Sequence, residues 1–364
     1  MNLEALFTPF TVKSLRLRNR FVMSPMSRYS CPDRVPNDEL IDYYRRRAAA
    51  EVGLVMTGAA AIDRPAANNS PVLADFRPAC YPMWRRGVEA VHQAGGSIAI
   101  QLWHAGSSRL PGVEDWPAPL ESPSGLAGAH RKVAEPMSEA AIGAVITEFG
   151  RSAAAAQELG FDAVEIHAAH GFLLDQFFWQ ETNRRNDRWG GPRIEDRARF
   201  AAEIIREVRR SVGPEMAISV RLSQWKEQDY EARLAHDPDE LSSWLAPLVD
   251  AGADMFHCSQ RRWWEAEFAD SDLNFAGWVK KLAGKPTITV GSVGLDVEVM
   301  SFFDGAVAKP ASIDAVAQRL ERGDFDLVAV GRTLLADPEW VLKVRDSRYH
   351  HLKPFDKSAA DVVY

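Results

Sequence analysis

Eight short runs of apolar and β-branched residues recur along this chain, and each is followed by a longer stretch with the spacing of an amphipathic helix. Each run ends in, or is followed within two residues by, small or polar residues. Regular alternation of strands and helices is typical of parallel βα units. We therefore predict an α/β protein of the (β/α)8 TIM barrel class, with strands at Phe21–Met26, Gly53–Thr57, Ser97–Leu102, Asp162–His167, Met216–Leu222, Asp254–Ser259, Pro286–Gly291 and Asp326–Gly331.

Residues that begin and end helices lie between these strands. Ser138 precedes a stretch whose apolar residues follow helical spacing, and Gly160 ends that stretch before the fourth strand. The run Asp237-Pro238-Asp239-Glu240 places a proline and a glutamate after an N-cap aspartate, which is a capping-box pattern. A further helix is expected to open at Pro192 and to close at Gly213.

Segments outside the repeating units predict what covers the two ends of the barrel. Residues 7–12 and 15–18 are expected to form a hairpin under the floor. Long irregular stretches follow strands three, five and six, at 105–137, 223–236 and 260–276, and are expected to lie over the mouth. The first is marked as non-helical by Pro111, Pro117, Pro119, Pro123 and Pro136. No composition break divides the chain, so residues 1–364 are predicted to form a single domain.

Composition narrows the function classes. With 46% hydrophobic residues, 26% charged residues and a net charge of −7, the chain is of the soluble globular type, and no nucleic-acid partner is expected. We interpret the basic run Arg45-Arg46-Arg47 as a solvated helix face. Three scattered cysteines, no signal peptide and no apolar run of about twenty residues predict a cytoplasmic protein without a membrane span.

Two histidines at the end of the fourth strand are the most informative chemical feature. His167 and His170 follow a short apolar run and precede Gly171, so a buried parallel strand would deliver both imidazoles to the barrel mouth. Such a pair could ligate a metal, carry a proton or donate N–H bonds to an oxygen that develops negative charge. The residues alone leave these three chemistries open.

The last two strands predict a phosphate site. Strand seven runs into Val290-Gly291-Ser292-Val293-Gly294 and strand eight into Val330-Gly331-Arg332. Small residues there let backbone N–H groups approach an anion, and the loops after strands seven and eight of barrels commonly bind phosphate. No G-x-G-x-x-G motif follows a strand, so we expect a mononucleotide at the mouth and no separate dinucleotide domain.

An ordered set of motifs along nearly the whole chain resembles the old yellow enzyme family of FMN-dependent NADH:flavin oxidoreductases. The motifs are Asn19 to Ser27, Gln101 to Gly106, Glu165 to Gly171, Asn183 to Gly191, Arg221 and Gly331-Arg332. The resemblance implies noncovalent FMN over the barrel mouth and NADH or NADPH as the electron donor. It also implies that FMN is bound by Pro25, Met26, Ser27, Ala59, Gln101, Arg221, Gly291, Ser292, Val293, Gly331 and Arg332. In the same resemblance His167 and His170 bind the acceptor oxygen of a substrate, and Tyr29 is a further substrate-binding residue.

Phe172 departs from the family pattern, because ene-reductases of this family usually carry at that position a tyrosine that protonates the substrate. Phenylalanine has no proton to donate, so water or another hydroxyl does this, or alkene reduction is not the physiological reaction. Ser27 stands where many relatives have cysteine or threonine. Trp225, Trp263 and Trp264, with Arg261 and Arg262, are candidate pocket walls or surface residues.

We therefore expect an FMN-dependent oxidoreductase that uses NAD(P)H to reduce a small conjugated carbonyl, quinone or nitro compound. One alternative is a flavin dehydrogenase or demethylase that oxidises a small amine or ring substrate, which Phe172 keeps open. Two others are a metal-dependent barrel hydrolase and a flavin-binding storage or sensor protein. The expected partner is a small molecule, and a homo-oligomer is compatible with the sequence.

Overall fold

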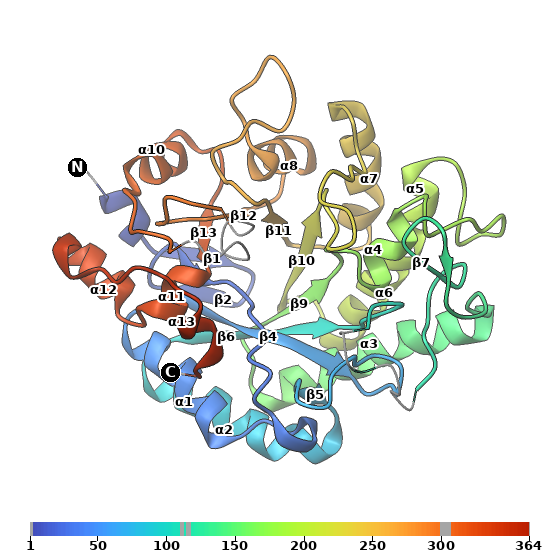
Figure 1. Cartoon of the computed structure of the whole chain (residues 1–364), viewed down its shortest axis with the longest axis horizontal. Coiled ribbons are helices and arrows are strands. Elements are labelled where there is room, and N and C mark those ends of the chain that lie inside the picture. The colour runs from blue at the N-terminus through green and yellow to red at the C-terminus, as the bar shows by residue number, and fades with distance from the viewer. Residues whose placement is uncertain (1–2, 110–112, 114–117, 299–306, 364) are drawn as a thin grey trace.

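The computed structural model describes residues 3–109, 113, 118–298 and 307–363. Eight parallel strands form a closed barrel, because the first and last members of the row β3-β13-β12-β11-β10-β9-β6-β4 also pair with each other. Helices surround these strands, so the fold is the predicted TIM barrel (Figure 1). The barrel strands are β3 (Phe21–Met23), β4 (Leu54–Ile62), β6 (Ser97–Trp103), β9 (Ala163–His167), β10 (Ala217–Ser223), β11 (Met255–Ser259), β12 (Thr287–Val290) and β13 (Leu327–Val330).

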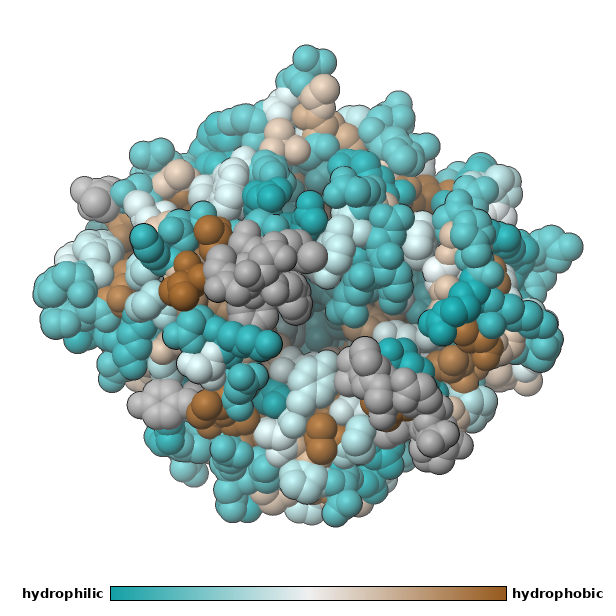
Figure 2. All heavy atoms as spheres, in the orientation of Figure 1, coloured by the Kyte–Doolittle hydropathy of each residue, from teal (hydrophilic) through white to brown (hydrophobic). Residues whose placement is uncertain are grey.

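A helix follows each barrel strand and covers the outside of the barrel. The face viewed in Figure 2 is mainly hydrophilic, and its hydrophobic side chains lie in small separate groups. The described helices are α1 (Asp38–Ala49), α2 (Tyr81–Gln93), α3 (Glu139–Leu159), α4 (Leu173–Phe178), α5 (Ile194–Arg197), α6 (Arg199–Val212), α7 (Pro238–Asp250), α8 (Phe275–Ala283), α10 (Asp314–Arg322), α11 (Arg332–Ala336), α12 (Trp340–Arg345) and α13 (Ser358–Asp361). Short 3-10 helices lie at Glu4–Phe7, Pro32–Arg34, Pro78–Cys80 and Tyr349–His351.

Alternation along each strand decides what the barrel contains. In β9, Val164 and Ile166 belong to the core between strands and helices, whereas Ala163 belongs to a second core inside the barrel. Glu165 and His167 share the inward face with Ala163, because successive side chains of a strand point to opposite sides. The inside is therefore apolar at the floor and polar toward the mouth, and the polar end is where a ligand can be held.

The floor is closed by the predicted hairpin. Its strands are β1 (Phe10–Val12) and β2 (Leu15–Leu17), which pair antiparallel. Leu15 and Leu17 lie in one buried apolar cluster with side chains of all eight barrel strands, among them Ala99, Ala163, Ala217 and Met255. The hairpin is shorter than expected, because Phe7 belongs to a 3-10 helix and Pro9 separates that helix from β1.

Several predicted element bounds were wrong by a few residues. β3 ends at Met23 and not Met26, since Pro25 has no N–H to continue the ladder. β4 runs to Ile62, because its last residues pair with β5 (Asp75–Phe76) beyond the barrel. The helix expected from Pro192 is divided into α5 and α6, and Gly213 ends the second as predicted.

The predicted caps of two helices are confirmed. Ser138 accepts a hydrogen bond from the N–H of Ala141, and Gly160 ends α3 in the left-handed conformation with φ 93°. Asp237 caps α7 by accepting hydrogen bonds from the N–H groups of Asp239 and Glu240. These side chains satisfy backbone groups that have no partner within the helix.

The basic run in α1 is only partly a solvated face. Arg45 and Arg46 pair with Asp42 at the surface, as expected for such a face. Arg47, in contrast, is fully buried and donates hydrogen bonds to the carbonyl oxygens of Tyr43 and Leu334. The interpretation was therefore wrong for Arg47, which satisfies buried carbonyls that the sequence pattern does not reveal.

The described part of the excursion at 105–137 contains no helix, as predicted, but it does contain a short hairpin. Its strands are β7 (Leu126–Ala127) and β8 (Arg131–Lys132). Of the prolines expected to prevent a helix, Pro111 and Pro117 lie outside the described residues. The buried side chain of His104 and the side chain of Arg64 both bond to Glu121, which fastens this excursion to the end of β6.

Candidate active site

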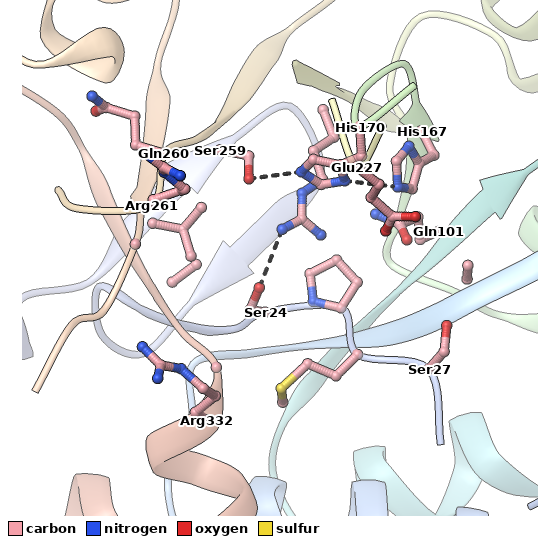
Figure 3. A pocket seen from close by; sticks show the side chains of 18 of the residues that line it. Ser24, Ser27, Gln101, His167, His170, Glu227, Ser259, Gln260, Arg261 and Arg332 are labelled. Carbon is pink, nitrogen blue, oxygen red and sulfur yellow. Dashed lines mark hydrogen bonds between the residues drawn. The ribbon is translucent and has the colours of Figure 1, made fainter. Parts of the chain in front are cut away.

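A cavity of about 390 Å³ lies at the carboxyl end of the barrel strands. Every barrel strand, or the segment directly after it, contributes to its walls. Figure 3 shows several of these side chains. The structure brings together in this cavity all the residues that the sequence predicted for the site: Pro25, Met26, Ser27, Tyr29, Ala59, Gln101, His167, His170, Arg221, Gly291, Ser292, Val293, Gly331 and Arg332.

One wall is formed where the segment after β3 passes close to β4. Gly58 permits this approach, because a Cβ atom there would lie 2.5 Å from the carbonyl oxygen of Met26. The pairing of β4 with β6 shifts register between Met56 and Ala59, and Ala59 lines the cavity. The wall thus consists of backbone and short side chains, which suits a flat ligand.

A buried polar layer lies inside the barrel beside the cavity. Glu165 accepts hydrogen bonds of 2.8 Å from Gln101 Nε2 and 2.8 Å from Ser219 Oγ, and its Oε2 lies 3.0 Å from His257 Nδ1. Burial alone would raise the pKa of Glu165, but His257, Arg221 and Ser219 lower that pKa to about 2. The ionised carboxylate therefore fixes the orientation of the Gln101 amide at the cavity wall.

Arg221 brings a buried positive charge to the same wall. Its side chain is 7% exposed, and among the described residues its Nε has no hydrogen-bond partner. One Nη atom reaches Ser24 Oγ at 3.5 Å, a long contact. Burial lowers the pKa of Arg221 to about 10, and Glu165 opposes that shift. A guanidinium with so few protein partners is suited to a ligand that presents carbonyl oxygens or negative charge.

The predicted histidine pair forms a short hydrogen-bonded chain. His167 Nδ1 lies 3.4 Å from the N–H of Ala169, which leaves its Nε2 to donate across 3.4 Å to His170 Nδ1. His170 Nε2 then donates to Ser259 Oγ at 2.8 Å (Figure 3). The two contacts of 3.4 Å in this series of hydrogen bonds are weak, and a ligand oxygen could replace them.

Both imidazoles are neutral at neutral pH. Burial, followed by the charge of Arg221, lowers the pKa of His167 to about 3. The same two causes lower the pKa of His170 well below its usual value. The pair can therefore donate N–H bonds to an oxygen but cannot serve as a cationic acid.

Phe172 and Tyr29 lie at the cavity with different capacities. The Phe172 ring packs edge-on against Trp103 at 5.2 Å and against His167 at 5.1 Å between ring centroids. It offers no proton. Tyr29 is 48% exposed, and burial of its surroundings together with the charge of Glu227 raises the pKa of its hydroxyl. Tyr29 therefore presents a neutral phenol at the rim.

The glycine loops after β12 and β13 form the other end of the cavity. Gly291 has φ 140°, and a Cβ atom there would lie 2.5 Å from the carbonyl oxygen of Gln260. Arg332 Nη2 donates to Ser292 Oγ at 2.9 Å and to the carbonyl oxygen of Val297 at 2.9 Å. A cation fixed beside the backbone of this glycine loop fits an anionic group such as phosphate.

Sequence reasoning missed Glu227, Gln260 and Asn69, which also line the cavity. Trp225 and Arg261, two of the candidate wall residues, do line it. The other three do not belong to its lining: Trp263 is buried, Trp264 is 43% exposed, and Arg262 pairs with Glu265. A signal for Glu227 was its place in the irregular stretch predicted after strand five.

These features fit FMN. Arg221 and Gln101 at one end are suited to the polar edge of a flavin ring, and the Gly291 and Gly331 loops with Arg332 are suited to its phosphate.

Within the described residues no group of three or more histidine, cysteine, aspartate or glutamate side chains is arranged to hold a metal. The metal-dependent hydrolase alternative thus lacks a ligand set in that part of the chain.

Comparisons with known proteins agree with this geometry. The model of the NADH:flavin oxidoreductase / NADH oxidase family matches residues 5–351. The chain is 30% identical over 344 residues to an NADPH dehydrogenase of Bacillus subtilis, with 92% of each chain covered. It is 31% identical over 348 residues to a chanoclavine-I aldehyde reductase of Penicillium roqueforti, covering 94% of this chain and 89% of the relative.

Longer relatives match as well. The chain is 30% identical over 361 residues to an NADH oxidase of Thermoanaerobacter brockii, covering 96% of this chain, but it spans only 52% of that relative's length. Among solved structures, morphinone reductase in complex with tetrahydroNAD has a TM-score of 0.79 and 27% identity, covering 98% of this chain and 94% of that chain. In the described residues no helix is long and apolar enough to cross a membrane. The chain belongs to the NADH:flavin oxidoreductase / NADH oxidase family, the old yellow enzyme family, and is an FMN-dependent oxidoreductase that uses NADH or NADPH.

Proposed function

We propose that this chain is one FMN-binding domain that uses NAD(P)H to reduce small conjugated carbonyl, quinone or nitro compounds. The observation that carries the proposal is the buried guanidinium of Arg221, whose Nε has no hydrogen-bond partner among the described residues, in the same cavity as two neutral histidines. The relatives named as reductases support the direction of the reaction.

The cavity residues fall into two groups, one that would bind FMN and one that would bind the acceptor. The first group divides further by the part of FMN that it would contact. Pro25, Met26, Ser27 and Ala59 are proposed to form the cavity wall against the flavin ring. Gln101 and Arg221 are proposed to bind the polar edge of that ring. The phosphate is assigned to Gly291, Ser292, Val293, Gly331 and Arg332. When bound, FMN supplies hydride chemistry between NAD(P)H and the acceptor.

The histidines and Tyr29 are assigned to the acceptor. His167 Nε2–H and His170 Nε2–H are neutral donors that can turn from each other and from Ser259 to an acceptor oxygen. Hydrogen bonds of this kind withdraw electrons from a conjugated C=C–C=O system and make its β-carbon more electrophilic. Tyr29, at the rim, is proposed to contact the same substrate through its neutral hydroxyl.

The test uses the purified flavin-loaded enzyme. Under anaerobic conditions NADH or NADPH should bleach the flavin absorbance, and quinones, nitro compounds, maleimides or enones should restore it. Bleaching by a small amine such as sarcosine, with no bleaching by either nicotinamide, would contradict the proposed direction and favour the dehydrogenase alternative. Recovery of absorbance with none of these acceptors would contradict the proposed acceptor class.

A further inference from the structure

The loop after β10 is fastened to the histidine pair by a buried ion pair. Lys226 Nζ lies 2.8 Å from Asp175 Oδ1, and both side chains are fully buried. Lys226 also donates to the carbonyl oxygen of Gln224 at 2.8 Å, and Asp175 accepts the N–H of Gly171 at 2.7 Å. Residue 226 is thereby held against the segment that carries His170.

This anchor fixes the position of the next residue, Glu227. Its N–H donates to the carbonyl oxygen of His170 at 3.2 Å, and its side chain lines the cavity (Figure 3). Within the described lining residues it is the one carboxyl group. Glu227 is exposed at the cavity mouth, and partial desolvation by the surrounding groups raises the pKa of its carboxyl to about 7. Glu227 can therefore hold a proton near neutral pH.

None of the pKa values given above for the other ionisable lining side chains lies near neutral pH. His167 and His170 are already neutral, and the pKa of the Tyr29 hydroxyl lies above its usual value. Arg221 remains charged at neutral pH. Phe172 has no ionisable group. A proton donor for the substrate is thus missing from the position where relatives carry tyrosine, but a carboxyl lies elsewhere in the same cavity.

We propose that Glu227 is the catalytic acid of this enzyme, donating the proton that completes alkene reduction in place of the tyrosine replaced by Phe172. The proposal rests on the proposed function, because it requires a conjugated carbonyl substrate in this cavity. It also assigns Lys226 and Asp175 as positioning residues, since they hold the backbone that carries the acid.

The step balances as follows. When bound, FMN would supply the hydride, taken from NAD(P)H, for the C–H bond at the β-carbon. The π electrons of the C=C bond move toward the carbonyl to give an enolate, whose oxygen is bound by His167 and His170. The O–H bond of Glu227 then breaks while the α-carbon gains the proton and the C=O bond re-forms. The carboxylate left on Glu227 takes a proton from water.

This chemistry predicts a pH dependence. The acid form of Glu227 is required, so alkene reduction should be fast below pH 7 and should slow as the pH rises through its pKa. The titratable and charged groups that share its surroundings are Tyr29, Tyr230, Arg261, His167, His170, Arg221, Lys226, Asp175 and Asp229. Asp175 also titrates near this range, because burial raises its pKa to about 6. Its ionisation as the pH rises strengthens the pair with Lys226, so it does not produce the loss of activity expected from Glu227.

The experiment compares Glu227→Gln with the matched control Glu231→Gln, which removes a carboxylate from the same loop at a side chain that is 89% exposed. Rapid mixing follows each half-reaction of the flavin-loaded enzymes separately. In Glu227→Gln, flavin reduction by NAD(P)H and reoxidation by a quinone, which is protonated on oxygen by water, should stay within about twofold. Reoxidation by a simple enone should fall at least about a hundredfold and lose its pH dependence.

Each outcome is decisive. Enone reoxidation that is equal in Glu227→Gln and the unchanged enzyme overturns the assignment, and so does an equal fall with enone and quinone. An unchanged enzyme that reduces quinones but no enone overturns it too, while the proposed oxidoreductase function stands. If neither acceptor reoxidises the flavin, the proposed acceptor class fails and the assignment fails with it. Loss of the enone rate in Glu231→Gln as well would show a general effect of loop charge and overturn the specific role.

Discussion

Replacing Lys226 with methionine tests the buried ion pair under the active-site loop. The variant leaves the Asp175 carboxyl fully buried without its cation. Even beside Lys226, burial raises the pKa of Asp175 to about 6. Without the ammonium this carboxyl should take up a proton in the folded state and not remain ionised.

The double variant Lys226→Met with Asp175→Asn serves as the reference, because an amide can be buried without taking up a proton. The difference in unfolding free energy between the two variants is the cost of protonating Asp175 in the single variant. At pH 7, protonating a carboxyl whose unfolded pKa is about 3.9 requires about 4 kcal/mol, at 1.36 kcal/mol per pH unit. The folded single variant holds a proton that the unfolded chain releases, so its stability falls as the pH rises. The double variant should thus be the more stable by about 4 kcal/mol at pH 7 and about 3 kcal/mol at pH 6.

The assay is thermal unfolding of the flavin-loaded variants at pH 6 and pH 7. An unfolding entropy of about 2.1 cal/mol/K per residue gives, for 364 residues, about 1.3 °C of Tm per kcal/mol. The double variant should unfold about 5 °C above the single variant at pH 7 and about 4 °C above it at pH 6. Equal Tm values at both pH values would refute the reasoning, since Asp175 would then not depend on Lys226.

Three further predictions concern the cavity. Arg332→Ala should weaken FMN binding about ten- to a hundredfold in a fluorescence titration, since a charge-assisted hydrogen bond contributes about 1.5–3 kcal/mol, and unchanged affinity would remove Arg332 from the phosphate site. Replacing both His167 and His170 with alanine should abolish the phenolate-to-flavin charge-transfer band but preserve flavin content; a surviving band contradicts their role. Glu165→Gln should lower stability at pH 7 by about 3 kcal/mol, because it removes a buried carboxylate that His257, Arg221 and Ser219 stabilise in its charged form. The folded pKa of Glu165, about 2, lies below its unfolded value, so its contribution is lost as the pH falls toward 2, and the Tm deficit should shrink in acid; a constant deficit would contradict this.

The barrel and the inward-facing residues of its strands could be predicted from local patterns. In β9 the order Ala163, Val164, Glu165, Ile166, His167 alternates between inside and outside, so the positions of Glu165 and His167 follow from one apolar neighbour. Parallel register then brings Gln101 and Ser219 beside Glu165. Side chains alternate regularly along a strand, so a matching alternation of residue types in the sequence is enough to predict which of them point inward.

Loop contacts could not be predicted in the same way, because they depend on residues distant in sequence. His170 meets Ser259, and Lys226 meets Asp175, through bonds that span 89 residues in the first case and 51 in the second by residue number. Arg47 of α1 is buried and bonds to the carbonyl oxygen of Leu334 in α11, 287 residues further along the chain. A local pattern of apolar and polar residues cannot predict such contacts between residues distant in sequence.

The same division explains how, in our proposal, the acid lies on a different loop from Phe172 while the flavin site stays at the strand ends. The residues that hold the flavin in our proposal lie at strand ends or directly after them, where register fixes their position. A proton donor needs only to reach the substrate from the mouth, which several loops surround. Phe172 and Glu227 lie on loops after different strands, β9 and β10, and both line the cavity. Because a change in either loop need not disturb the barrel, the loop after β10 can supply the proposed acid while the strand ends hold the flavin.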